Sequence, residues 1–272
     1  MNSDATSNRG DGAEATDSAD APISHAKTRG RRSLLRAALA GSAVLGGGLA
    51  IGAFPADAEP VSSKTRATPS LSAATRTRPS TPEEALTELS KGNRRWRTFH
   101  QRHPDEDAAL RKALTTGQEP FALILGCIDS RVPPELVFDQ GLGDLMTVRS
   151  AGEVLDESVF GSVKYGVLEL DIPLVMVLGH QSCGAVKAAV AADQTGEELP
   201  SHIQYIADEI APAIDHSVDG DARIAATIDA NVRLVRSKLT ADSDIAAKLK
   251  ADEVAVVGAR YDLTTQRVHL LK

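Results

Sequence analysis

Three short apolar runs constrain the fold of this chain more than any other feature. They read "FALILGC", "LMTVRS" and "IPLVMVLGH", they end at Cys127, Ser150 and His180, and Gly, Pro or Asp bounds each of them. Runs of this length and composition are typical of the fully buried strands of a parallel sheet. Between the second and third runs, residues 156–171 carry apolar side chains at helical spacing. This alternation of strands and helices predicts an α/β fold.

Capping and turn signals around these runs outline one domain. Thr81 as N-cap, Pro82 at the first helical position and Glu84 at the third form a capping box for a first helix. A second helix is expected between Pro104 and Gly117, and "VAVVGARYDLTTQRVHLL" predicts two closing strands joined by a turn. Three more helices are expected at residues 183–193, 200–215 and 221–239. We therefore predict a single α/β domain over residues 81–272, with a mostly parallel central sheet flanked by helices and an N-terminal helical arm.

The first 58 residues carry the features of an export signal. Ala37–Phe54 runs for 18 residues without a charge, but it is built mainly from Ala and five Gly, which is weak for a membrane span. The adjacent Arg31 and Arg32 precede this run, and Ala56-Asp57-Ala58 follows it as a small-residue cleavage site. The pattern resembles a twin-arginine signal, with Leu34 where Phe is usual. The alternative is an uncleaved anchor.

The expected mature protein is therefore exported, to the extracellular space, the periplasm or the cell envelope, and has no stable membrane span. Residues 59–80 are rich in Ser, Thr, Pro and Arg, which predicts a disordered linker. Residues 81–272 carry 20 Lys and Arg against 30 Asp and Glu. An acidic domain of this kind argues against nucleic acid as a partner.

The only two cysteines of the chain and one histidine form a candidate metal site. Cys127 and His180 end two of the predicted strands, where open α/β sheets bind ligands, and Cys183 begins the following helix. Two thiolates and an imidazole suit Zn²⁺ and leave its fourth position open. Taken singly, each residue has a simpler explanation, because lone cysteines and histidines are often just buried core residues.

The segment "CIDSRV" adds two charged residues beside this site. Asp129 could orient a water molecule on the metal, or it could occupy the fourth zinc position itself. Arg131 can hold Asp129 through a forked pair of hydrogen bonds and so decide between these outcomes. The alternative for Asp129-Ser130-Arg131 is a turn at a strand end with a surface ion pair.

Together, "CIDSRV" and "GHQSCGAV" resemble the β-class carbonic anhydrases, whose signatures are CxDSR and HxxCG, over roughly the whole region from Thr81 to Lys272. The resemblance implies an enzyme, a zinc lyase that hydrates CO2 reversibly to bicarbonate and a proton through zinc-bound hydroxide. It implies that the zinc ligands are Cys127, His180 and Cys183. It also implies that the catalytic dyad consists of Asp129 and Arg131.

Further positions are carried over from the family. Gln118 matches a substrate-site glutamine of one branch, Tyr165 matches an aromatic residue of the cleft, and Gly184 could offer a backbone N–H to the substrate oxygen. The family also implies N-terminal helices that wrap a neighbouring subunit, with the cleft at the dimer interface, so a homodimer or homotetramer is expected. Apolar residues at suitable spacing for such an arm are Leu86, Leu89, Trp96 and Phe99. The alternative is that they pack on their own domain.

Two other functions are compatible with the same residues. A hydrolase of carbonyl sulfide or carbon disulfide would need the same scaffold and the same activated water. A non-catalytic, secreted zinc-binding module would use the metal structurally. Structural zinc sites usually have four Cys or His ligands, whereas this chain has two cysteines and no further histidine in an obvious position.

Overall fold

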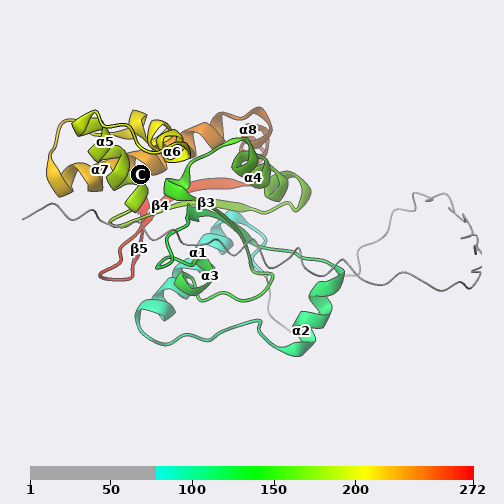
Figure 1. Cartoon of the computed structure of the whole chain (residues 1–272). Helices are drawn as coiled ribbons and strands as arrows, with labels where there is room; N and C mark the ends of the chain where they lie inside the picture. The colour runs from blue at the N-terminus through cyan, green and yellow to red at the C-terminus, as the bar shows by residue number, and fades with distance from the viewer. Residues whose placement is uncertain (1–77) are drawn as a thin grey trace, which may run out of the picture. The chain divides into compact units, whose positions relative to one another are not determined.

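A computed structural model describes residues 78–272 of the chain (Figure 1). The expected export signal at residues 1–58 and most of the expected linker at 59–80 lie outside the described residues. Within residues 78–272, none of the helices combines the length and the apolar character that a membrane span requires.

Five strands form one sheet in the order β2-β1-β3-β4-β5. Their bounds are β1 Ala122–Cys127, β2 Leu145–Ser150, β3 Leu174–His180, β4 Ala255–Tyr261 and β5 Val268–Leu271. The first four are mutually parallel and β5 is antiparallel to β4. The three apolar runs and the closing hairpin are therefore confirmed as strands, and the α/β prediction is confirmed with them.

Strand β2 departs from the expectation of a fully buried strand. Every residue of β1 and β3 is buried, whereas β2 is only partly buried and its Arg149 is exposed. The physical reason is its place at the edge of the sheet, where it pairs with β1 on one side and with no described strand on the other. An apolar run does not reveal whether its strand is central or at an edge.

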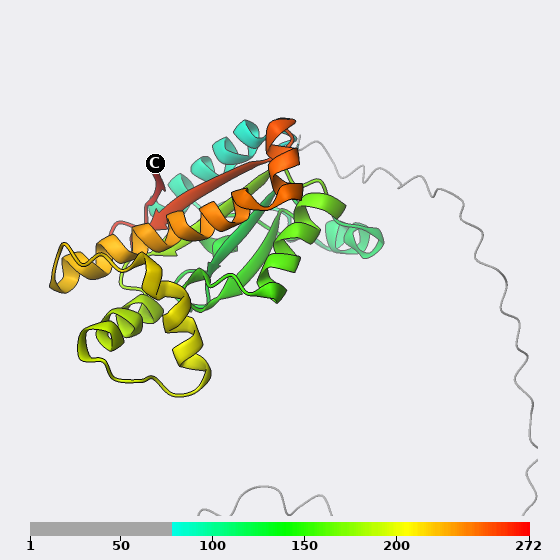
Figure 2. The same ribbon diagram turned by 90° about the horizontal axis from the view of Figure 1, so that it is seen from above.

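Helices cover both faces of the sheet (Figures 1 and 2). On one face lie α4 Glu157–Glu169, α5 Gly184–Thr195, α6 His202–Ile210, α7 Gly220–Ala241 and α8 Ser243–Lys250. On the other face lie α1 Pro82–Arg97 and α3 Pro134–Val137. The remaining helix is α2 Ala108–Ala113, and three short 3-10 segments are Leu114–Thr116, Ala151–Glu153 and Ala211–Ala213. The short helices α3 and α8 were not expected from the sequence.

Alternate residues of the central strands enter two different cores. Leu123 and Leu125 belong to the core that includes Val163 of α4 and Val232 of α7. Ile124, between them, belongs to the core on the α1 and α3 side. This alternation follows from the two-residue period of a strand, and it explains why β1 is apolar without interruption.

The N-terminal helix α1 packs mainly on its own domain. The hydroxyl of Thr81 accepts a hydrogen bond from Glu84 N at 3.2 Å, as the capping box predicts, but the Glu84 carboxylate accepts from Ser80 N at 2.9 Å. Leu89 is 1% exposed and Trp96 Nε1 donates to the Tyr261 hydroxyl at 3.0 Å. Within the single chain α1 therefore contacts its own domain, and the expectation that it also wraps a neighbouring subunit stays a prediction. Phe99, just beyond the helix, is 77% exposed.

Candidate metal centre

Two strand ends and one helix start bring three ligand side chains together. Cys127 is the last residue of β1, His180 is the last of the neighbouring β3, and Cys183 is the N-cap of α5. All three are buried, and one potential ligand atom from each lies within 4.8 Å of the others. The two Sγ atoms are 3.9 Å apart. The sequence prediction that these residues share one sheet edge is therefore confirmed.

The hydrogen bonding of the His180 imidazole leaves Nε2 free to bind a metal. Nδ1 lies 3.0 Å from the carbonyl oxygen of Gln181, so it donates a hydrogen bond there and the lone pair falls on Nε2. Nε2 is buried and has no hydrogen-bond partner within residues 78–272. A buried polar atom without a partner is costly, and a metal ion on Nε2 would remove that cost.

The contact between the two sulfur atoms favours the thiolate form of Cys127. The pKa of Cys127 is lowered to about 4, first by the hydrogen bond with Cys183, against the opposing effect of burial, and further by the nearby His180 side chain and by the N–H of Gly152. Gly152 N lies 3.3 Å from Cys127 Sγ. The same bond between the thiols, with burial, raises the pKa of Cys183. A divalent metal would displace the proton of Cys183, because metals bind the thiolate form.

Asp129 and Arg131 stand beside the ligands as a forked ion pair. Arg131 Nε donates to Asp129 Oδ1 at 2.9 Å and Nη2 donates to Oδ2 at 2.7 Å. These hydrogen bonds hold the pKa of Asp129 well below its usual range. Asp129 Oδ2 also lies 3.8 Å from His180 Nε2. The forked pair that the sequence indicated is present, and its carboxylate is adjacent to the candidate metal position.

Glu153 and Asn231 belong to the surroundings of the site and were not found from the sequence. Glu153 is 1% exposed and its Oε1 has no hydrogen-bond partner in the described part of the chain. Burial, and then the charge of Cys127, raise the pKa of Glu153 well above its usual value. Asn231 Nδ2 donates to the carbonyl of Gly152 at 2.8 Å and so orients the peptide segment that contacts Cys127.

A left-handed turn directs the Gly152 amide at the thiol. Gly152 has φ 63° and Glu153 has φ 54°. A Cβ at Gly152 would lie 2.7 Å from Ile210 Cδ1 and 3.0 Å from Ala185 Cβ, and the left-handed φ would strain it further, so glycine is favoured at this position. The "AGE" directly after β2 was the available sequence signal, because a glycine at a strand end often marks such a turn.

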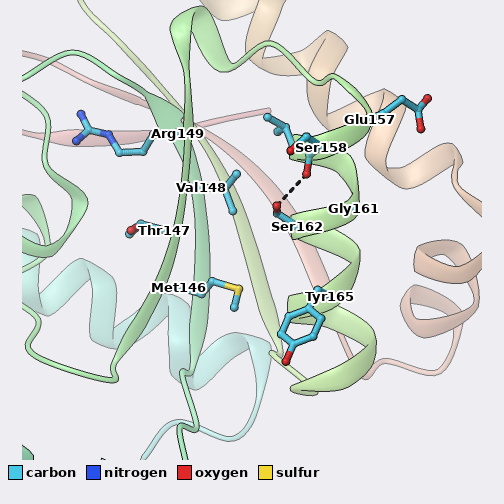
Figure 3. Close-up of a pocket in the computed structure, with 10 residues that line it drawn as sticks. Met146, Thr147, Val148, Arg149, Glu157, Ser158, Gly161, Ser162 and Tyr165 are labelled. Carbon is cyan, nitrogen blue, oxygen red and sulfur yellow. Dashed lines mark hydrogen bonds between the residues drawn. The ribbon is translucent and has the colours of Figure 1, made fainter. Parts of the chain in front are cut away.

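Of the three predicted substrate residues, only Gly184 lies beside the candidate metal ligands in the single chain. Gly184 is exposed and is the first residue of α5, adjacent to Cys183. Gln118 precedes the amino end of β1, whereas Cys127 ends that strand. Tyr165 lies on α4 near Met146, at the beginning of β2 (Figure 3). Within one chain neither Gln118 nor Tyr165 approaches the metal ligands, so their substrate role stays a prediction that requires a second subunit.

Strand β2 and helix α4 border an open groove of about 710 Å³, which we call the β2–α4 groove (Figure 3). Its lining includes Met146, Val148, Arg149, Gly161, Ser162 and Tyr165. None of the three candidate metal ligands lines it. The groove is therefore a feature of the exposed sheet edge and is distinct from the metal centre.

Comparison with known proteins gives the same class from sequence and from structure. A family model described as carbonic anhydrase matches residues 122–268. Carbonic anhydrase 2 of Mycobacterium tuberculosis is 39% identical over 191 residues, which cover 70% of this chain and 92% of that protein. The carbonic anhydrase of Mycolicibacterium smegmatis is 40% identical over 196 residues, covering 70% and 94%.

Solved structures show the same architecture. The β-carbonic anhydrase CcaA aligns with a TM-score of 0.56 at 23% identity, over 69% of this chain and 95% of that one. A Coccomyxa β-carbonic anhydrase aligns with a TM-score of 0.55 at 24% identity, over 68% and 86%. The fold is thus that of the β-class carbonic anhydrases, a class of metal-dependent lyases. The chain belongs to the carbonic anhydrase family.

Proposed function

We propose that this enzyme hydrates CO2 reversibly to bicarbonate and a proton with Zn²⁺ held by Cys127, His180 and Cys183. The observation that carries the proposal is the convergence of three buried ligand atoms within 4.8 Å, one of them the unpartnered Nε2 of His180. Two sulfurs and one nitrogen match the donors that zinc prefers, and three protein ligands leave the fourth position open. When bound, zinc lowers the pKa of a water molecule at that position.

Asp129 supplies the nearest carboxylate to the open position. Its Oδ2 lies 3.8 Å from His180 Nε2, which places it within reach of a water molecule beside the imidazole. There Asp129 would accept a hydrogen bond from such a water molecule and orient it toward the CO2 carbon. Arg131 holds the carboxylate ionised and in a fixed orientation through its two charge-assisted bonds.

Gly184 supports the negative charge that develops on the substrate oxygens. It begins α5, a helix of 12 residues, directly after the ligand Cys183. Backbone N–H groups in the first turn of a helix have no partner within the helix and attract negative charge. The N–H of Gly184 therefore favours the bicarbonate-like charge distribution over neutral CO2.

The active unit is proposed to be a homodimer, with a homotetramer as the larger assembly. Strand β2 presents an edge without a described partner, and such edges are usually paired or covered in native proteins. Phe99 is 77% exposed and Ile128, next to Cys127, is 60% exposed. A second copy on the β2 side would cover Ile128, whose N donates to Ser150 O of β2, and could bring its Gln118 and Tyr165 toward the site. Two related β-carbonic anhydrases of Sordaria macrospora are described as tetrameric.

Residues 1–58 are proposed as a twin-arginine export signal and residues 59–80 as a linker before the zinc domain at 81–272. The adjacent Arg31 and Arg32, the uncharged run and the small-residue cleavage site support this proposal. The curated relatives match over about 70% of the chain, a length comparable with that of the proposed zinc domain.

A stopped-flow assay of CO2 hydration by the zinc-loaded protein tests the function directly. We expect turnover that disappears when a chelator removes the metal and returns when zinc is restored. Carbonyl sulfide and carbon disulfide are assayed alongside. Hydrolysis of either substrate without CO2 hydration would replace the proposal with the hydrolase function. Bound zinc without any turnover would replace it with a non-catalytic zinc module.

A further inference from the structure

Arg149, near the end of β2, donates its side-chain hydrogen bonds to backbone carbonyls beside the candidate metal centre. Its Nε donates to the carbonyl of Cys127 at 2.8 Å and its Nη2 donates to the carbonyl of Asp129 at 2.6 Å. Nη2 also lies 3.5 Å from the carbonyl of Val132. Three carbonyls of the segment 127–132, which we call the 127–132 loop, thus converge on one guanidinium.

The sheet register explains how Arg149 reaches this loop. Arg149 pairs with Gly126 in the parallel β1–β2 ladder, one residue before Cys127. The side chain therefore begins beside the point where β1 ends and the loop starts. In Figure 3 the Arg149 side chain extends away from α4, on the opposite side of β2. Although Arg149 lines the β2–α4 groove, its donors face the loop.

Few backbone hydrogen bonds fix the 127–132 loop, so the side-chain donors of Arg149 add to them. In the loop, Ile128 N donates to Ser150 O at 3.2 Å and Val132 N donates to Asp129 O at 3.1 Å. Arg149 pairs with no carboxylate within residues 78–272, so its charge strengthens these backbone bonds instead of an ion pair. Only a planar guanidinium donates in two fixed directions at once, and a lysine in its place would act as a single point.

We infer that Arg149 is a positioning residue of the active site, which fixes the backbone of Asp129 and thereby keeps its carboxylate off the metal. This inference rests on the function proposed above. Arg131 acts on the carboxylate itself, whereas Arg149 acts on the carbonyl of the same residue. Because Asp129 Oδ2 is only 3.8 Å from His180 Nε2, a small movement of residue 129 suffices to bring an oxygen into the fourth zinc position.

The test compares Arg149→Lys with a matched control, Arg236→Lys. Arg236 Nε likewise donates to a strand carbonyl, that of Val256, at 3.0 Å, but in β4 and outside the described site. We expect Arg149→Lys to retain its zinc and to lose turnover by roughly 10- to 100-fold. A crystal structure of the zinc-loaded variant should show an Asp129 oxygen, in place of water, at roughly 2.0–2.2 Å from zinc. Water should return to this position in Arg149→Lys/Asp129→Ala, and Arg236→Lys should match the parent protein.

Amide hydrogen exchange in the metal-free, reduced protein tests the same inference without measuring enzyme activity. Arg149→Lys should accelerate exchange in the 127–132 loop and leave the amides of β3 protected, while Arg236→Lys should leave the loop unchanged. Unchanged loop exchange, or zinc coordination identical to that of the parent, would overturn the role of Arg149.

If the parent protein binds no zinc or hydrates no CO2, the proposed function fails, and loop exchange still decides whether Arg149 holds the loop. General unfolding of Arg149→Lys would appear as lost β3 protection, and Arg149→Gln, which keeps one donor group, is then measured in its place. Unchanged loop exchange in that second variant would count against the inference in the same way.

Discussion

Arg131 holds both carboxylate oxygens of Asp129, with Nε 2.9 Å from Oδ1 and Nη2 2.7 Å from Oδ2. The Arg131 backbone N also donates to Oδ1 at 2.9 Å. The carboxylate is thereby turned toward arginine although it stands near the metal ligands. To bind zinc it would have to give up these charge-assisted bonds, and zinc already neutralised by two thiolates offers a smaller gain in return. We therefore expect an open fourth position near neutral pH.

Removing Arg131 should close the site. In Arg131→Ala we expect the zinc content to stay near that of the parent and turnover to fall by about 10- to 100-fold, because Asp129 then competes with water for the metal. Zinc analysis and stopped-flow assays check both parts, and a crystal structure of the zinc-loaded variant shows whether water or Asp129 occupies the fourth position. Arg223→Ala is the control, since Arg223 of α7 pairs with Asp219, the N-cap residue of that helix, at 2.8 Å. An Asp129 oxygen at roughly 2.0–2.2 Å from zinc in the parent at neutral pH would contradict the expected open site.

Removing one thiolate should remove the metal. Cys183→Ser replaces a buried soft ligand with a hydroxyl, so we expect zinc affinity to fall by more than about 100-fold and activity to fall with it. Zinc measured after equilibration with a competing chelator checks this, and circular dichroism checks that the fold remains. Full zinc retention in the variant would show that Cys183 is not a ligand.

Replacing Glu153 should stabilise the protein at higher pH. Burial and the nearby Cys127 raise the pKa of Glu153 in the folded state, so the folded protein holds this proton more tightly than the unfolded chain. Stability is therefore lost as the pH rises from the unfolded value of about 4.3 through the raised folded value. Glutamine does not ionise, so the variant does not lose this stability as the pH rises.

We expect Glu153→Gln to unfold at a higher urea concentration than the parent at pH 8. The free energy of unfolding should be larger by about 1 kcal/mol or more at pH 8, with a smaller difference at pH 5. Urea titrations of the zinc-loaded proteins at both pH values measure this. The exposed Glu157→Gln on α4 serves as the control. A Glu153→Gln variant that loses stability equally at both pH values would contradict the account.

A charged side chain in the β2–α4 groove should separate the subunits. Gly161 lines this groove, and a Cβ at that position would meet no atom within 4 Å in the single chain. Gly161→Arg should therefore fold normally and sediment as a monomer, whereas the parent sediments as a dimer or larger. Ser237→Arg, at an exposed position of α7, should leave the assembly unchanged. A parent protein that is monomeric and fully active would refute the proposed dimer.

Export should depend on the arginine pair. Replacing both Arg31 and Arg32 by lysine should leave the protein in the cytoplasm, because the twin-arginine pathway recognises the pair as a unit. Cell fractionation and N-terminal sequencing check this, with a mature N-terminus expected near Glu59. Recovery of an unprocessed chain as an integral membrane protein would favour the anchor alternative.

The convergence of the three candidate metal ligands was predictable from the sequence because each position depends on local signals. Short apolar runs marked β1 and β3, and the carboxyl ends of parallel strands meet at one edge, so Cys127 and His180 had to be close. Cys183 lies three residues beyond His180 and could not be far away. Asp129 and Arg131 are near neighbours in the chain, which made their forked pair predictable as well.

The positions of Arg149, Glu153 and Asn231 were decided only in the tertiary structure. The register that pairs Arg149 with Gly126 depends on how two strands distant in sequence align, and a shift of one residue would turn the arginine to the other face. Glu153 is buried because η2, the 3-10 segment Ala151–Glu153, packs against β1, α5 and α7 at once. Local sequence patterns specify which elements form and where they end. Burial, register and edge position arise from elements packing together, so they are absent from any single stretch of sequence.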